Sequence, residues 1–283
     1  MINVLHSGFY TTIQDLGRER YQSLGVPISG ALDHNASKMA NAILGNDENC
    51  AILELTMLGP KLEFTCATII SIAGAEMLPM LNGDAIEAYK AINVKNGDIL
   101  SFGKLTQGFR TYLAVFGGIQ SEKVLDSRSM YKGITQSYML KKGDVLKILP
   151  GKHVPEKYSS IKHNTESILN QCIEVYKGPE FDKLSAKQMD AIHEIDFVIS
   201  KNNNRMAYQL ENLIANKLDQ IITSLVLPGT VQLTPSGRLI ILMRDCQTTG
   251  GYPRILQLSE SSINLLSQKK VGDKIKFKLK KYN

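Results

Sequence analysis

The chain has 283 residues, of which 43% are hydrophobic and 21% charged, and its formal net charge is +6. These values are typical of a globular protein, and the length allows one large domain or two of ordinary size. No apolar run reaches the roughly 18 residues of a membrane-spanning helix, and the N-terminus lacks the basic and apolar regions of a signal peptide; we therefore expect a soluble, cytoplasmic protein.

A polar stretch with several glycines opens the chain. It reads Thr-Thr-Ile-Gln-Asp-Leu-Gly-Arg over residues 11–18 and Gly-Val-Pro-Ile-Ser-Gly-Ala-Leu-Asp over residues 25–33. Loops held by a rigid scaffold often carry function. Asp33 stands at the N-cap position of a helix that we predict over residues 34–44, because the apolar residues there recur at helical spacing.

Most of the remaining chain favours strands. Strand patterns lie at residues 67–72, 99–102, 111–115, 173–176, 197–200, 239–243 and 274–279. Three similar units, ending at Asp98, Asp144 and Asp273, each place Gly-Asp in a turn just before a strand, which suggests repeated β-hairpins. Further helices are expected at residues 183–191 and 260–267.

A composition shift at residues 150–164 predicts a linker between two lobes, residues 1–150 and 151–283. The polar region 200–220 has the character of a loop.

The second conspicuous stretch is Asp-Cys-Gln-Thr-Thr-Gly-Gly-Tyr-Pro-Arg over residues 245–254. It follows a hydrophobic strand directly, and its adjacent glycines allow a ligand to approach the backbone closely. Threonine and glutamine side chains add hydrogen-bonding groups beside them. A tight turn that needs glycine for its dihedral angles is the alternative explanation.

The lysines near the C-terminus alternate with Ile275, Phe277 and Leu279, which is the period of a half-buried strand. They are expected to form a solvated face, so nucleic-acid binding is not predicted. The four cysteines form no Cys-x-x-Cys pair, and the five histidines show no metal-ligand spacing, so no metal site is expected.

The two polar stretches belong to a longer series of blocks, all in one order along the chain. The blocks are residues 11–18, 25–33, 42–46, 53–60, 110–119, 127–131, 178–180, 205–208, 227–232 and 247–253. In this order and spacing the chain resembles the biotin-dependent carboxyltransferase-like family, also called allophanate hydrolase subunit 2-like. Two departures are Asn204 and Ala207, where the family pattern has an acid and a glycine; a positive φ at Ala207 would be strained.

The resemblance implies a mainly β fold with a few helices: two cyclophilin-like β-barrel lobes with a cleft between them. It also implies the C subunit of an ATP-dependent 5-oxoprolinase, which opens 5-oxoproline to L-glutamate. The partners implied are a kinase-inhibitor-like B subunit and an A subunit of the LamB/YcsF type. The sequence has no nucleotide-binding loop, so ATP would bind with one of these partners, and the chain alone would be inactive.

Two alternatives stay open. One is a carboxyltransferase module that acts with carboxybiotin on urea or a related amide, and biotin belongs to this alternative only. The other is a non-catalytic regulator that binds a histidine-kinase inhibitor protein.

Candidate site residues come from both polar stretches and from the arginines of the other blocks, because guanidinium groups suit carboxylate binding. The predicted catalytic residues are Asp15, Asp33, Arg128 and Tyr252. The predicted substrate-binding residues are Gln14, Arg18, Arg110, Arg205, Tyr208, Gln247, Thr248, Thr249, Gly250 and Gly251. We expect the two stretches to face one another across the cleft.

Overall fold

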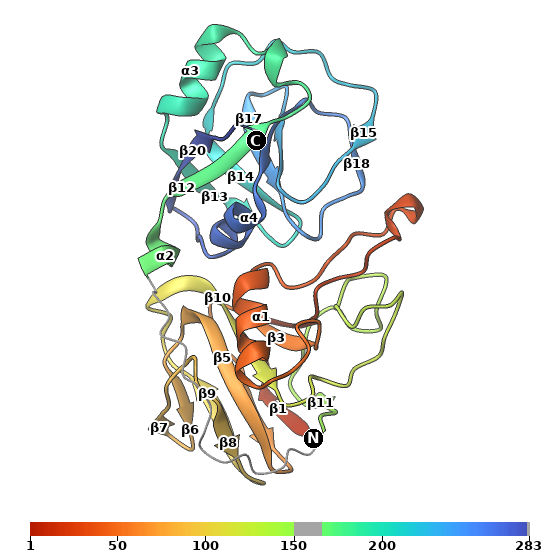
Figure 1. Cartoon of the computed structure of the whole chain (residues 1–283), viewed down its shortest axis with the longest axis vertical. Coiled ribbons are helices and arrows are strands. Elements are labelled where there is room, and N and C mark those ends of the chain that lie inside the picture. The colour runs from red at the N-terminus through yellow and green to blue at the C-terminus, as the bar shows by residue number, and fades with distance from the viewer. Residues whose placement is uncertain (150–165, 282–283) are drawn as a thin grey trace. The chain divides into compact units, whose positions relative to one another are not determined.

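The computed structural model describes residues 1–149 and 166–281, which form two compact units. The first unit contains Met1–Arg18 and Ser29–Ile168, and the second contains Leu169–Asn283 together with Glu19–Ile28. The predicted linker at residues 150–164, with the boundary at residue 150, lies outside the described residues. Figure 1 traces both units, and each is described by itself below.

Two sheets build the first unit. The six-stranded sheet has the order β11-β1-β4-β9-β6-β7 and the five-stranded sheet the order β2-β3-β10-β5-β8. The strands of the first sheet are β11 (Val145–Leu146), β1 (Ile2–His6), β4 (Lys61–Phe64), β9 (Ile99–Phe102), β6 (Pro79–Leu81) and β7 (Asp84–Ala85). Those of the second are β2 (Tyr10–Gln14), β3 (Ile52–Thr56), β10 (Gln107–Val115), β5 (Thr68–Glu76) and β8 (Ile92–Val94).

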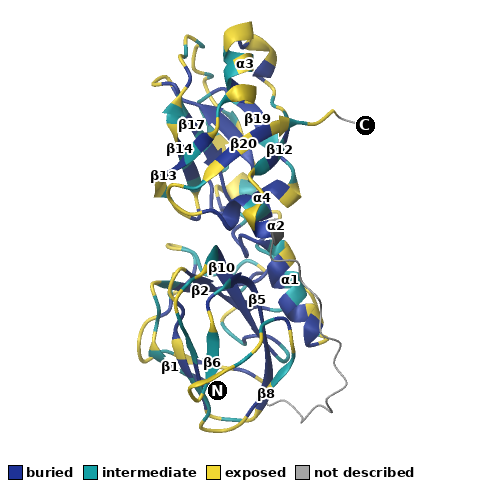
Figure 2. Cartoon of the chain, turned by 90° about the vertical axis from the view of Figure 1, so that its left-hand side faces the viewer, coloured by how far each residue is buried: buried dark blue, intermediate teal, exposed yellow. Residues whose placement is uncertain are grey.

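Alternating side chains give the five-stranded sheet two buried faces. Ile13, Leu53 and Leu113 belong to the larger hydrophobic cluster, which also contains Val4 and Phe64 of the other sheet. On the opposite face, Ile52, Tyr112 and Ala114 form a second cluster with the apolar residues of α1 (His34–Ile43). Figure 2 shows these strands mainly in the colour of buried residues.

The second unit is a closed antiparallel barrel apart from one parallel pair, β12 with β20. Its strands follow the order β12 (Cys172–Lys177), β19 (Arg254–Leu258), β16 (Thr230–Leu233), β17 (Arg238–Leu242), β14 (Ala207–Leu213), β13 (Phe197–Asn203) and β20 (Lys274–Leu279). Phe197 and Phe277 pack in its interior with ring centroids 5.3 Å apart. A separate two-stranded ribbon joins β15 (Ser224–Leu225) to β18 (Thr249–Gly250).

The predicted mainly β fold is confirmed, and each of the seven predicted strands overlaps a strand of the structure. The helices predicted at 34–44 and 260–267 are α1 and α4 (Glu260–Ser267). The third predicted helix begins later, as α3 (Ala186–Glu194), because Ser185 and Gln188 form a capping box that fixes its start. Residues 181–183 form a 3-10 turn instead, as do residues 22–24, and Glu166–Leu169 forms the short helix α2.

The loop predicted over residues 200–220 is wrong in part, because β13 extends to Asn203 and β14 occupies Ala207–Leu213. Polar residues mask this hairpin in the sequence, yet Tyr208 and Leu210 alternate into the barrel core and are fully buried.

The three Gly-Asp units are turns of one kind. In each, the aspartate side chain accepts a hydrogen bond from the amide three residues earlier, at Lys95, Lys141 and Lys270, over 2.7–2.9 Å. Each glycine has a positive φ and donates its amide to a neighbouring strand, at Phe64, Val4 and Ile199. The same turn therefore recurs in both units, twice in the first and once in the second.

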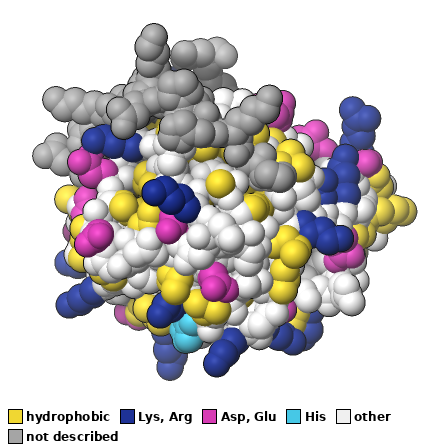
Figure 3. All heavy atoms as spheres, turned by 90° about the horizontal axis from the view of Figure 1, so that it is seen from below, with side chains coloured by type: hydrophobic (Ala, Val, Ile, Leu, Met, Phe, Trp, Pro, Cys, Tyr) yellow, Lys and Arg dark blue, Asp and Glu magenta, His cyan; other side chains and the backbone are white. Residues whose placement is uncertain are grey.

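No helix in the described part of the chain is both long and apolar enough to cross a bilayer. On the face drawn in Figure 3, basic side chains are scattered among acidic and apolar ones rather than gathered in one patch.

Candidate functional site

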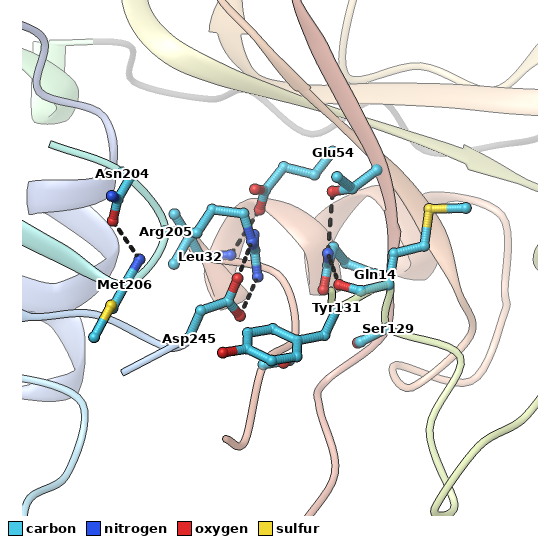
Figure 4. Close-up of polar contacts among 12 residues, drawn as sticks. Gln14, Leu32, Glu54, Ser129, Tyr131, Asn204, Arg205, Met206 and Asp245 are labelled. Carbon is cyan, nitrogen blue, oxygen red and sulfur yellow. Dashed lines mark hydrogen bonds and ion pairs between the residues drawn. The ribbon is translucent and has the colours of Figure 1, made fainter. Parts of the chain in front are cut away.

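A buried polar row crosses the helix-covered face of the five-stranded sheet. The strand register places Thr12, Glu54 and Tyr112 opposite one another on β2, β3 and β10. The Glu54 carboxylate accepts hydrogen bonds from the Leu32 amide at 2.7 Å and from the Tyr112 hydroxyl at 3.0 Å. Figure 4 shows the contact with Leu32. Glu54 therefore points into a polar network, a choice that the sequence pattern left open.

Two predicted residues meet at this network. Arg110 brings its Nε atom to 3.7 Å from Glu54, and both side chains are buried. The Tyr112 hydroxyl accepts the Asp33 amide at 2.8 Å. Burial, reinforced by the negative charge of Glu54, raises the pKa of Tyr112 well above its usual value, so the phenol remains a neutral donor.

Asp33 is the N-cap of α1, as the sequence predicts. Its Oδ1 atom accepts a hydrogen bond from the Ala36 amide at 3.0 Å. The cap fixes the start of the helix beside Glu54 and Tyr112. The predicted catalytic role of Asp33 stays a prediction.

Asp15 has a buried carboxylate that accepts four hydrogen bonds. The hydroxyls of Ser127 and Ser129 both reach Oδ1 at 2.6 Å, and the Gly17 amide reaches it at 2.8 Å. The Arg128 amide donates to Oδ2 at 2.6 Å. Such a set of hydrogen bonds fixes the segment that supplies the donors. This geometry supports a positioning role for Asp15.

The neighbours of Asp15 bind the same segment. Gln14 donates its amide to the Met130 carbonyl at 3.3 Å and to the Thr12 hydroxyl at 3.0 Å, contacts drawn in Figure 4. Arg18 is fully buried; it bonds the Ser129 carbonyl and donates to the Ser29 hydroxyl at 3.1 Å. The block at residues 11–18 thus holds residues 127–130.

In the second unit, Arg205 and Asp245 form a buried bidentate pair with distances of 2.8 and 3.1 Å (Figure 4). Asn204 precedes the arginine, and its side-chain oxygen accepts the amides of Met206 at 2.8 Å and Ala207 at 3.0 Å. An acid could accept the same two bonds, so asparagine preserves the turn. Ala207 is absent from the residues with positive φ, and the strain considered for it does not arise.

The glycine-rich stretch forms one strand of the β15–β18 ribbon, in which Thr249 pairs with Leu225 and Gly250 with Ser224. A Cβ atom on Gly250 would lie 2.5 Å from Nε2 of Gln232, whereas on Gly251 it would lie 3.2 Å from the nearest atom, the Ile221 carbonyl oxygen. Neither glycine has a positive φ. Gly250 therefore lies in close contact with the amide end of Gln232, a side chain that has to shift before a Cβ atom fits at this position.

Arg254 ends this stretch and anchors the ribbon. It forms a bidentate pair with Glu180, donating through Nε at 3.0 Å and through an η nitrogen at 2.9 Å, and its other η nitrogen donates to the Leu225 carbonyl at 2.9 Å. The hydrogen bonds from Arg254 lower the pKa of Glu180 below its usual value. The block at residues 178–180 therefore supports the ribbon.

Two glutamines near the ribbon have unsatisfied amides within the described residues: Nε2 of Gln232 and Oε1 of Gln247 are buried with no hydrogen-bond partner there. Unpaired buried polar atoms are uncommon in proteins and call for an explanation. Sequence reasoning named Gln247 as a site residue but not Gln232, although the block at residues 227–232 ends at it. The signal that could have found Gln232 is a glutamine at a buried position of a strand whose other residues are Thr, Val and Leu.

The remaining predicted residues differ in exposure. Thr249 is exposed, and Thr248 and Tyr252 are half-buried. Tyr208 is fully buried, and its hydroxyl donates to the Lys269 carbonyl at 3.3 Å, a position that favours packing in the barrel. No group of His, Cys, Asp or Glu side chains in the described ranges is arranged to hold a metal ion.

The structure thus brings predicted residues together within each unit. Gln14, Asp15 and Arg18 contact residues 127–130, which include Arg128. Thr249 and Gly250 form one strand of the ribbon, and Gln247 and Thr248 precede it. The meeting of both stretches in one cleft concerns the placement of one unit against the other, and it stays a prediction.

Comparison with known families decides the relationship. The model of the carboxyltransferase domain, subdomain A and B, matches residues 24–279. The chain belongs to this family. It is 33% identical to the C subunit of 5-oxoprolinase from Escherichia coli K12, over 98% of the chain and 90% of that protein.

Larger relatives contain the same domain. Urea amidolyase of Saccharomyces cerevisiae is 30% identical over 98% of this chain, which spans only 16% of that protein. Among solved structures, urea carboxylase of Kluyveromyces lactis superposes with a TM-score of 0.86 at 28% identity, over 98% of this chain and 27% of that one. The carboxyltransferase fold of both units is therefore shared with these domains.

Proposed function

We propose that this carboxyltransferase-family chain is the C subunit of an ATP-dependent 5-oxoprolinase, which opens the lactam of 5-oxoproline to L-glutamate. One observation carries the proposal: the match to a 5-oxoprolinase C subunit is nearly full length in both proteins, 98% of this chain and 90% of the relative. The matched urea amidolyase, in contrast, devotes 16% of its length to this region.

In this proposal the subunits carry out different steps of the reaction. A lactam resists attack by water until its carbonyl is activated, and ATP supplies that activation through phosphorylation. The sequence offers no nucleotide loop of a known kind, so in this proposal ATP binds with the A or the B subunit. This chain contributes carboxylate-binding cations and the backbone of residues 247–251, whose amides can polarise a carbonyl as an oxyanion site does.

The decisive assay uses the purified chain with and without the A and B subunits, which are sought among the products of neighbouring genes. We expect 5-oxoproline-dependent ATP hydrolysis and glutamate release only from the assembled set. We also expect the chain and the B subunit to elute together in size-exclusion chromatography at micromolar concentration. Full activity from the chain alone, or no activity from the complete set, would reject the proposal.

A carboxyltransferase acting on urea is the second candidate, favoured by the TM-score of 0.86 with a urea carboxylase. It would need a carboxybiotin carrier, which the present chain lacks as a recognisable motif. Incubation with a carboxylated biotin carrier and urea separates the two candidates: carboxyl transfer to urea supports the second, and its absence beside active 5-oxoproline hydrolysis supports the first.

A further inference from the structure

The first unit contains a pocket of about 370 Å³ that none of the roles described so far uses. Its walls come from β11, from residues 119–122 and from the 128–137 region, all within this unit. This volume falls within the range of small-molecule sites, which are concave, largely apolar and supplied with a few polar groups.

Arg128 supplies the main charge of the pocket. The half-buried guanidinium donates to the Ser121 carbonyl and, at 3.4 Å, to Oε1 of Gln120. It makes no ion pair with any carboxylate of residues 1–149 or 166–281. A half-buried guanidinium that donates only to neutral oxygens has no ionic partner, so it can pair with an anionic ligand.

The backbone beneath Arg128 is fixed. Its amide donates to Asp15 at 2.6 Å, and the serines on either side donate to the same carboxylate. The guanidinium therefore projects from a rigid segment, which reduces the entropy lost when a ligand binds.

The other polar groups of the pocket differ in whether they have a partner within the chain. Lys147 is exposed at the rim and has no carboxylate partner among the described residues, and the Ser121 hydroxyl is buried without a hydrogen-bond partner there. The two acids of the lining accept backbone amides: Glu122 accepts the Gln136 amide and Asp144 accepts the Lys141 amide, each at 2.8 Å. The groups that can meet an anionic ligand include the two cations and the Ser121 hydroxyl.

One part of the wall is apolar. Ile13, Ile119 and Met130 line it, and the first two belong to the core of the unit. A ligand that complements both the cations and the apolar wall of the pocket has one carboxylate and a compact, weakly polar body.

We propose that this pocket binds a small carboxylate, with Arg128 as its anchor, Lys147 as a second cation at the rim and Asp15 as the residue that positions Arg128. The choice of 5-oxoproline as the ligand rests on the function proposed above, whereas the carboxylate class rests on the pocket alone.

Isothermal titration calorimetry of the full chain, without ATP or partner proteins, tests the proposal with two matched probes. 5-Oxoproline carries the carboxylate, and pyrrolidin-2-one is the same lactam without it. We expect 5-oxoproline to bind and pyrrolidin-2-one to bind at least about tenfold more weakly, which corresponds to about 1.4 kcal/mol.

Three variants locate the site. Arg128→Met should weaken 5-oxoproline binding at least about tenfold and Lys147→Met several-fold, since one ionic hydrogen bond contributes on this scale. Lys142→Met, an exposed lysine outside the pocket, should bind like the wild type. Lys147 is exposed, so its substitution tests the site even if Arg128→Met fails to fold.

Equal affinity for both probes, no binding of 5-oxoproline, or unchanged affinity in Lys147→Met and Arg128→Met would overturn the proposal. Its failure is distinguishable from failure of the proposed function. A chain that binds 5-oxoproline through Arg128 while the complete complex hydrolyses none leaves the pocket standing and rejects the function. An active complex in which Arg128→Met and Lys147→Met bind 5-oxoproline like the wild type rejects the pocket and leaves the proposed function standing.

Discussion

The two glycine-rich polar stretches look alike in the sequence but are used differently in the structure. In the first unit, the side chains of Gln14, Asp15 and Arg18 bind residues 127–130. In the second unit, residues 247–251 include a strand of the β15–β18 ribbon, one exposed threonine, and a buried amide oxygen of Gln247 that has no partner among the described residues. Dense polar side chains can therefore either bind a neighbouring segment or remain without partners in the chain, and only the hydrogen bonds distinguish the two cases.

The largest effect is expected at Asp15. Asp15→Ala removes the acceptor of four hydrogen bonds, and we expect the free energy of unfolding to fall by about 3–5 kcal/mol, because each buried donor left without an acceptor costs about 1–3 kcal/mol and the four costs are not fully additive. Urea denaturation measures it, and Asp15→Asn should lose less because one oxygen remains. A loss of under about 1 kcal/mol for the alanine variant would mean that the network does not hold the loop.

A somewhat smaller loss is expected for the ion pair of the second unit. Arg205→Ala leaves the Asp245 carboxylate buried without its partner, which costs about 3 kcal/mol. A double-mutant cycle with Asp245→Ala measures the coupling between the two side chains. Additive single effects would show that the bidentate geometry contributes no interaction energy.

The adjacent glycines should respond unequally. A methyl group on Gly250 meets Gln232 Nε2 at 2.5 Å, the far end of a flexible side chain, so Gly250→Ala should cost about 1 kcal/mol, the scale of displacing that side chain from its rotamer. Gly251→Ala, with its nearest atom at 3.2 Å, should cost less. Thermal unfolding compares the two, and the cost at Gly250 should shrink in a Gln232→Ala background. An equal loss of stability for Gly250→Ala in both backgrounds would show that contact with Gln232 does not cause the loss.

The smallest effect is a pH dependence at Glu180. Its pKa is lowered in the folded state by Arg254, so the pair stabilises the fold above the unfolded pKa of about 4.3 and loses that contribution as the pH falls through the folded value. The stability difference between wild type and Glu180→Gln should therefore be full at pH 7 and narrow below about pH 4. A difference that stays constant across this range would contradict the role of the ionised carboxylate.

Much of the fold could be predicted from the sequence because its signals are local. Apolar alternation located the strands, Asp33 marked the start of α1, and the Gly-Asp turns were recognisable from two residues each. The β13–β14 hairpin escaped because its polar residues hide the alternation of Tyr208 and Leu210.

The candidate site was less predictable because its contacts join residues far apart in the chain. Asp15 accepts hydrogen bonds from donors more than a hundred residues away, and Gln232 approaches Gly250 from another strand. No local sequence pattern indicates either contact. Glu54 illustrates the limit, since an acid between two leucines fits an exposed position and a buried network equally well until Leu32 and Tyr112 are seen beside it.

The central claim is that the first stretch holds the scaffold and the second contacts substrate. The most direct test measures the unfolding free energy of the chain and kcat/KM of the assembled complex for Asp15→Asn and Gln247→Ala in parallel. We predict that Asp15→Asn lowers stability, whereas Gln247→Ala leaves stability within about 0.5 kcal/mol, the range of substitutions that break no stabilising feature, and lowers kcat/KM at least about tenfold. A Gln247→Ala variant with wild-type kcat/KM, or an Asp15→Asn variant of undiminished stability with lost activity, would contradict the claim.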